Sequence, residues 1–291
     1  MTAASDNGAA TLRSTTTRDL ASYEVDSSAI DHNAQRLLIN YSGVPKQEIG
    51  PHVDAIRKKA FAIFAYPCIG SYRFLDLSIS QRKEYPEIVR RLKGGEKIMD
   101  LGCCFGQVIR QLVVDGVPSE NTYGSDLRQE FIDLGYDLFK DKGKIKTTFL
   151  AADVFDDNSR LTQIYGQISI VYTGSFFHLF DYEEQIDVAK RVIQLLIPEK
   201  GAMILGRQVG NVNAGDYSAD SYPGVIGRFR HNSKSWTEFW DEVGEVTGTR
   251  WKVEAELVPL GIGNGESSDA NLMKLREENG TRKMQYVVTR V

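Results

Sequence analysis

The chain has 291 residues, of which 42% are hydrophobic and 25% are charged, and its formal net charge is −4. This length allows a large apolar core, and the acidic balance counts against a nucleic-acid partner, because proteins that bind polynucleotides usually carry a basic face. The N-terminus lacks the apolar run of a signal peptide, and no stretch of about 18 apolar residues occurs, so we predict a soluble, cytoplasmic protein without a membrane span. The three cysteines, Cys68, Cys103 and Cys104, contain no CxxC pair, so neither a metal site nor a redox motif is expected.

The N-terminal third is predicted to be helical after a polar tail. Residues 1–25 are rich in Ser, Thr, Ala and Asp, which is typical of a disordered tail. Residues 26–95 are predicted to form a helical cap, because apolar residues recur at helical spacing around 37–41 and 56–64. Another helix is predicted near 86–92, with Pro86 in its first turn.

From residue 96 to the C-terminus, short apolar runs alternate with amphipathic segments. Such alternation predicts an α/β domain with a parallel sheet that has helices on both faces. The predicted strands are 97–101, 122–125, 147–151, 168–172, 202–205, 251–257 and 284–289, and the predicted helices are 107–114, 129–139, 183–196 and 236–246. The last two strands predict a terminal hairpin, which gives seven strands with six parallel and one antiparallel. Residues 209–234 are predicted to be an inserted loop of the kind that often forms a lid or binding loop.

A glycine-rich turn follows the first predicted strand, in the sequence Asp100-Leu-Gly-Cys-Cys-Phe-Gly106. Ligands of open α/β sheets bind at the carboxyl ends of the strands, near the point where the strand order reverses. Gly102 lets the backbone turn and approach a ligand closely, and the start of the following helix favours a negatively charged group. A loop of this kind can also be an ordinary turn, so its neighbours matter.

Two further acids end the next two predicted strands. Asp126 could accept hydrogen bonds from both hydroxyls of a ribose, and Asp153 could accept one from an adenine amino group. For one aspartate alone, a helix cap or a turn residue would be the favoured interpretation. Three acids at the ends of three successive strands favour a cofactor site.

Residues 97–205 resemble the core of class I methyltransferases that depend on S-adenosylmethionine (SAM). The stretch from Asp100 to Gly106 is similar to the D/E-x-G-x-G-x-G loop of that family, although Cys104 stands where the middle glycine is usual. The resemblance implies a Rossmann-like fold of seven strands and SAM as cofactor, with Asp126 at the ribose, Asp153 at the adenine and Asp100 near the methionine end. The implied cofactor-binding residues are Asp100, Gly102, Cys103, Gly106, Asp126, Leu127, Asp153, Val154 and Ser175. An NAD-linked enzyme is the nearest competitor, but it would favour GxGxxG where this loop reads GCCFGQ.

The methyl acceptor is expected beside the segment after the fourth predicted strand. His178 is a candidate active-site residue there, together with Phe176, Phe177 and Phe180, although His178 could equally be a packing residue. A phenol acceptor would benefit from a general base such as His178. A carboxylic acid is already ionised at neutral pH and would instead favour cationic groups. The candidate cationic groups are Arg207 after the fifth predicted strand, Arg228, Arg230 and His231 in the insertion, and Arg73 ahead of the core. Arg207 and Arg230 are the first of these to test.

A narrower resemblance, to fungal methyltransferases of meroterpenoid biosynthesis, covers nearly the whole chain after the tail. It is carried by the helical region 31–66, the segment Tyr66-Pro-Cys-Ile-Gly70, the glycine loop and the segment Ser175-Phe-Phe-His-Leu-Phe180. It implies methyl-ester formation on a hydrophobic carboxylic acid of a prenylated, polyketide-derived precursor, and a homodimer. A phenol O-methyltransferase with His178 as base, and a catalytically silent SAM-binding module, are the alternatives.

Overall fold

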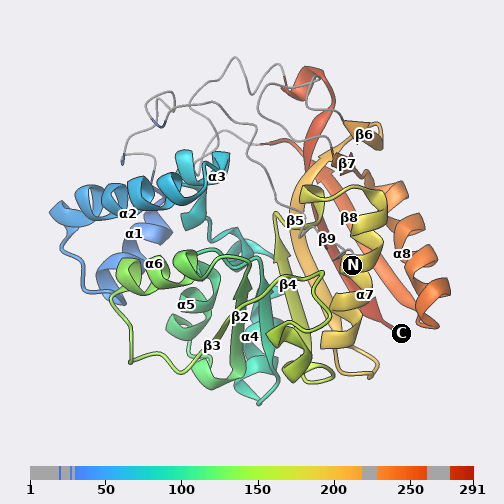
Figure 1. Ribbon diagram of the computed structural model, residues 1–291, viewed down its shortest axis with the longest axis horizontal. Coiled ribbons are helices and arrows are strands. Elements are labelled where there is room, and N and C mark those ends of the chain that lie inside the picture. Colours follow the sequence, from blue (N-terminus) through green and yellow to red (C-terminus); the bar gives the residue numbers. More distant parts are fainter. Residues whose placement is uncertain (1–19, 21–26, 28–29, 218–227, 261–275) are drawn as a thin grey trace, which may run out of the picture.

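The computed structural model describes residues 20, 27, 30–217, 228–260 and 276–291, so the predicted tail over residues 1–25 lies almost wholly outside the described residues. One seven-stranded sheet forms the centre of the molecule, with the strand order β3-β2-β1-β4-β5-β9-β8 (Figure 1). Its strands are β1 (Ile98–Leu101), β2 (Thr122–Asp126), β3 (Thr148–Ala151), β4 (Ile170–Gly174), β5 (Met203–Asn211), β8 (Trp251–Val258) and β9 (Thr281–Arg290).

The directions of the strands confirm the predicted topology. β1 pairs in parallel with both β2 and β4, and β9 pairs antiparallel with both β5 and β8. Six strands therefore share one direction and β9 opposes them. The strand order reverses between β1 and β4, which places the ligand-binding crevice at the carboxyl ends of these two strands.

Helices cover both faces of the sheet (Figure 1). Successive side chains of β1 point to opposite faces: Ile98 packs in a cluster with α4 (Tyr85–Lys93) and α5 (Gln107–Val114), whereas Met99 packs in a cluster with α7 (Tyr182–Leu195) and α8 (Ser233–Thr247). Both faces of β1 are therefore apolar, as is usual for a central parallel strand. No helix of the described ranges is both long and apolar enough to cross a membrane.

The N-terminal helices lie beside α6 (Gln129–Phe139), as Figure 1 shows. They are α1 (His32–Asn40), α2 (Ile49–Ile63) and the short α3 (Pro67–Gly70), and together with α6 they enclose a second apolar cluster. A buried polar contact adds to this packing, because the hydroxyl of Tyr41 donates to Asp141 (2.8 Å), which also pairs with Arg110. The predicted helices of the cap are confirmed, while its boundary at residues 26–95 stays a prediction.

The segment predicted as a loop over 209–234 is partly strand. β5 continues to Asn211 along β9, and β6 (Gly215–Tyr217) pairs antiparallel with β7 (Arg228–Arg230); residues 218–227 lie outside the described part. The prediction ended β5 too early because glycines interrupt its apolar pattern. Gly206 is required there, since a Cβ atom would lie 2.4 Å from the carbonyl oxygen of Thr173.

Candidate cofactor and acceptor site

The glycine loop turns sharply after β1. The amides of Gly102 and Cys103 both donate to the carbonyl oxygen of Ser125 (2.8 Å each), and Gly102 has a φ of +77°. A Cβ atom at Gly102 would lie 2.6 Å from the ring of Phe176, so glycine is required both by the turn and by this close approach. Gly106 has a φ of +69° and directly precedes α5.

Cys104, the departure from the usual glycine pattern, also has a left-handed backbone, with a φ of +52°. This conformation costs a residue with a side chain on the order of 1 kcal/mol. The amide of Cys104 donates to Asp126 Oδ2 (2.9 Å), and this bond to a carboxylate offsets the cost. The loop therefore keeps a glycine-like path without the glycine.

Asp126 ends β2, where it is half-buried. Its Oδ2 accepts from the amide of Cys104, and its Oδ1 accepts from the amide of Arg128 (3.1 Å). Burial raises the pKa of Asp126, and these backbone donors oppose the rise. A carboxylate oxygen has two lone-pair directions, so each oxygen can accept a further hydrogen bond from a ligand.

Asp100 is the last but one residue of β1, whose four residues are all buried, and it is 3% exposed. Its Oδ2 has no hydrogen-bond partner among the described residues. Burial, together with the nearby charge of Asp126, raises the pKa of Asp100 to about 8. A buried carboxyl group of this kind favours a cationic hydrogen-bond donor, which would lower its pKa and restore its charge. The ammonium group of SAM has this chemistry, so the site fits the cofactor that the resemblance implies.

Asp153 lies just beyond the carboxyl end of β3, which adjoins β2: Asp126 is opposite Ala151 in the parallel register. Its carboxylate accepts from the amide of Phe155 (2.9 Å). Leu127 is 45% exposed beside Asp126. The side chain of Val154, in contrast, packs in the core, and its carbonyl oxygen accepts from Arg191 (3.0 Å). A ligand could therefore contact Val154 only through its backbone or the exposed part of its side chain.

The acceptor-side segment, residues 175–180, follows β4. Ser175 has a φ of +60°; its amide donates to the carbonyl oxygen of Arg207 (2.6 Å), and its hydroxyl accepts from the guanidinium of Arg207 (2.7 Å). The ring of Phe176, the next residue, lies against Gly102. Phe177 is fully buried against Trp236, with ring centroids 5.2 Å apart, so it belongs to the core rather than to the wall of a site.

His178 lies within this segment, and its Nδ1 is buried without a hydrogen-bond partner among the described residues. Burial, together with the positive charges of Arg230, Arg73 and Arg207, lowers the pKa of His178 to about 3. His178 is therefore neutral at physiological pH. The charges of three arginines from separate elements, η4 (Arg73–Leu75), β5 and β7, thus act on one imidazole.

The cationic candidates differ in their surroundings. Arg207 forms an ion pair with Asp76 (2.7 Å). Arg230 is 5% exposed, donates to Thr281 (3.2 Å) and lies over the ring of Tyr217. The inclusion of His231 among the cations was wrong: it is fully buried and hydrogen-bonded, and burial lowers its pKa to about 3.

Two side chains that order the acceptor-side segment carried no signal in the sequence. Asp76 reaches Arg207 from the N-terminal region. Gln185, fully buried on α7, donates to the carbonyl oxygens of Phe180 (3.0 Å) and Phe229 (3.1 Å) and so ties the segment to β7. The bonds from Asp76 to Arg207 and from Gln185 to Phe229 join parts of the chain that are far apart in sequence, so only the fold reveals them.

Comparison with known proteins identifies the family. Residues 22–75 match the family model described as the meroterpenoid methyltransferase N-terminal domain. The O-methyltransferase phiE of a fungal species is 45% identical over 240 residues, which cover 81% of this chain and 79% of the relative. The Asnovolin E/Chermesin D methyltransferase nvfJ of Aspergillus novofumigatus is 45% identical over 226 residues, which cover 77% of this chain and 81% of the relative. The chain belongs to the fungal meroterpenoid methyltransferases.

Other comparisons agree with this membership. The O-methyltransferase atr3 of Stereocaulon alpinum is 41% identical over 271 residues, covering 92% of this chain and 75% of the relative. Among solved structures, the phosphoethanolamine N-methyltransferase 2 of Haemonchus contortus, determined with S-adenosylhomocysteine, has a TM-score of 0.50 at 10% identity over 81% of this chain and 59% of its own. This structural likeness shows a shared methyltransferase fold. The resemblance and the fold predicted from the sequence are thereby confirmed.

Proposed function

We propose that this methyltransferase uses SAM to form a methyl ester on a carboxylic acid of a hydrophobic meroterpenoid precursor. The observation that carries the ester assignment is the neutral His178, with its pKa lowered to about 3, among three arginines. The names of the relatives give methyltransferase or O-methyltransferase activity and the meroterpenoid class, and they support this proposal at that level.

In this proposal each of the three aspartates at the strand ends binds a different part of SAM. Asp100 holds the ammonium group, Asp126 accepts from the ribose hydroxyls, and Asp153 accepts from the adenine amino group. Gly102, Cys103, Gly106, Leu127, Val154 and Ser175 line the rest of the cofactor site. SAM supplies an activated methyl group, so the protein has mainly to align the acceptor and exclude water.

The charges of the acceptor side favour a carboxylate over a phenol. A useful general base has a pKa near the working pH, and His178, with a pKa of about 3, lies far below it. A carboxylate needs no base, because it is ionised at neutral pH. The positive charges of Arg230, Arg73 and Arg207 all act on His178, and a positive local potential favours an anionic acceptor.

His178→Gln should lower kcat by well under about 10²-fold, because no required base is lost; a general base typically contributes about 10² to 10⁴ in rate. Arg230→Ala should mainly raise KM for the acid, because a group that binds the carboxylate is removed. Steady-state kinetics from pH 6 to 9 measure both, and the kcat profile should show no ionisation of a histidine. A large kcat loss in His178→Gln that high pH rescues, with Arg230→Ala near normal, would point to a phenol instead.

The homodimer and the cytoplasmic location implied by the sequence stay predictions, as does the division at residue 96. They do not enter the ester proposal, because every residue that it uses lies within one chain.

A further inference from the structure

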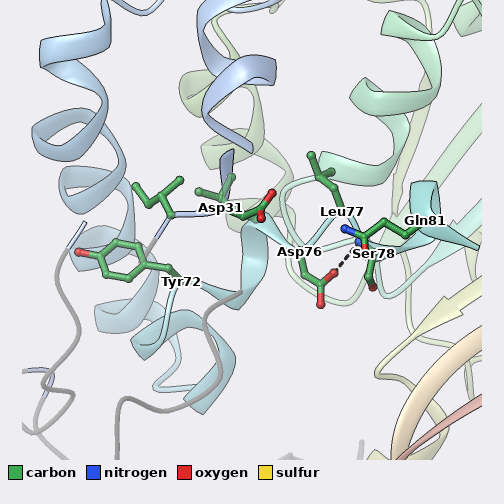
Figure 2. Close-up of a pocket in the computed structure, with 8 residues that line it drawn as sticks. Asp31, Tyr72, Asp76, Leu77, Ser78 and Gln81 are labelled. Atoms are coloured by element: carbon green, nitrogen blue, oxygen red, sulfur yellow. Dashed lines mark hydrogen bonds between the residues drawn. The ribbon is translucent and has the colours of Figure 1, made fainter. Parts of the chain in front are cut away.

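The carboxylate of Asp76 connects the N-terminal region to β5. Asp76 lies between η4 and η5 (Ser78–Gln81), and its Oδ2 is 2.7 Å from a guanidinium nitrogen of Arg207, with side chains that are 14% and 12% exposed. Its Oδ1 accepts from the amide of Ser78 (2.7 Å), the bond drawn in Figure 2 at the edge of a small pocket. Both oxygens are thus engaged, and Asp76 is fixed in orientation.

Arg207 links Asp76 to the acceptor-side segment, residues 175–180. Its second terminal nitrogen donates to the hydroxyl of Ser175 (2.7 Å), while its carbonyl oxygen accepts from the amide of Ser175 (2.6 Å). Ser175 is held by two bonds from one residue in a left-handed conformation that a serine rarely adopts. Backbone strain of this kind persists where surrounding contacts impose it.

The direction of the chain after Ser175 depends on this conformation. Phe176 follows directly and rests on Gly102 of the cofactor loop, and His178 lies on the short helix η8 (Phe177–Leu179). If Ser175 left its left-handed backbone conformation, the side chains of Phe176 and His178 would both change position. The path from Asp76 through Arg207 to Ser175 therefore sets the geometry of the acceptor side.

We propose that Asp76 is a positioning residue for methyl transfer, which acts through Arg207 to hold Ser175 and hence the acceptor-side segment. The inference rests on the proposed methyltransferase activity for its kinetic readout. It also assigns Arg207 to positioning, in place of direct binding to the acceptor carboxylate. Burial alone would raise the pKa of Asp76, but Arg207, Ser78 and Arg73 together hold it below its usual value, so Asp76 stays charged at neutral pH.

The test is a double-mutant cycle with Asp76→Asn, Ser175→Ala and the double variant. Each single variant should lower kcat for the acceptor about tenfold, and the double variant should lose no more than the worse single one. In Asp76→Asn the dissociation constant for SAM should stay within about threefold of wild type. SAM binding is spared in Asp76→Asn because Asp126 is held by the amides of Cys104 and Arg128. Asp187→Asn, which breaks an exposed ion pair on α7, is the matched control and should behave as wild type.

Two results would overturn the proposal: Asp76→Asn indistinguishable from Asp187→Asn, or losses that multiply in the double variant. If Asp76→Asn fails to fold, Ser175→Ala tests the proposal instead, because it leaves the ion pair between Asp76 and Arg207 intact. A wild-type kcat in Ser175→Ala would also contradict the positioning role.

A readout that needs no turnover separates this inference from the proposed function. The chain has four histidines, so ¹⁵N spectra of histidine-labelled protein can follow His178, with its signal assigned by its loss in His178→Gln. Asp76→Asn and Ser175→Ala should both shift that signal, and Asp187→Asn should not. Shifted signals in a protein that methylates no acid would contradict the ester proposal but not the positioning role. An unchanged His178 signal in the two variants would contradict the positioning role but not the ester proposal.

Discussion

Asp126→Ala should raise the dissociation constant for SAM about 10²-fold or more. In the proposed site Asp126 accepts from two ribose hydroxyls, and a hydrogen bond to a charged group contributes about 1.5–3 kcal/mol. Two such bonds amount to about 3 kcal/mol, and each 1.4 kcal/mol is about tenfold in affinity. The loss also frees the amide of Cys104, which Asp126 holds in its left-handed turn (2.9 Å). Calorimetric titration with SAM measures the effect.

Asp126→Asn should lie between wild type and Asp126→Ala, because an amide oxygen still accepts one bond. Asp187→Ala removes an exposed carboxylate far from the loop and should bind SAM normally. Unchanged affinity in Asp126→Ala would remove Asp126 from the cofactor site.

Asp141→Asn should lower the free energy of unfolding by about 3 kcal/mol or more, because it leaves a buried arginine without its counter-ion. Arg110 is 1% exposed and donates two hydrogen bonds to the carboxylate of Asp141, at 2.8 and 2.9 Å. The guanidinium also donates to the carbonyl oxygen of Phe105 (2.8 Å) in the glycine loop, and Tyr41 reaches Asp141 from the end of α1. Unfolding in guanidinium chloride, followed by circular dichroism, measures the loss.

Asp187→Asn is again the matched control, and its exposed pair with Lys190 should contribute less than about 1 kcal/mol. The pair Arg110→Met and Asp141→Leu should recover part of the loss when combined, since no buried charge then remains. A change below about 1 kcal/mol in Asp141→Asn would show that water or relaxation compensates for the missing charge.

The local signals in the sequence were sufficient for most elements of the fold. The helices predicted at 107–114 and 129–139 match α5 and α6, because each has a strong amphipathic period and a clear start. The strand predicted at 202–205 was too short, since β5 is extended by its pairing with the distant β9. The strands β6 and β7 were missed for the same reason: three residues each, they depend on one another.

The candidate site likewise contains residues that local sequence patterns predict and contacts that only the folded chain creates. Asp100, Asp126 and Asp153 were predicted because each lies at or just beyond the carboxyl end of a strand whose pattern is visible locally. The bond between Asp76 and Arg207 joins segments that meet only in the folded protein. The neutral state of His178 depends on burial and on arginines from three separate elements, and no spacing in the sequence encodes it.

Transfer of a labelled methyl group tests the central claim most directly. The protein is incubated with SAM carrying a ¹³C-methyl group and with a panel of hydrophobic aromatic and terpenoid carboxylic acids, each paired with its phenol analogue. Mass spectrometry and ¹³C spectra then locate the label, before and after mild base hydrolysis. The account predicts S-adenosylhomocysteine together with a labelled methyl ester that base cleaves back to the acid. Label retained after base in an aryl methyl ether, with the acids left unmodified, would contradict it.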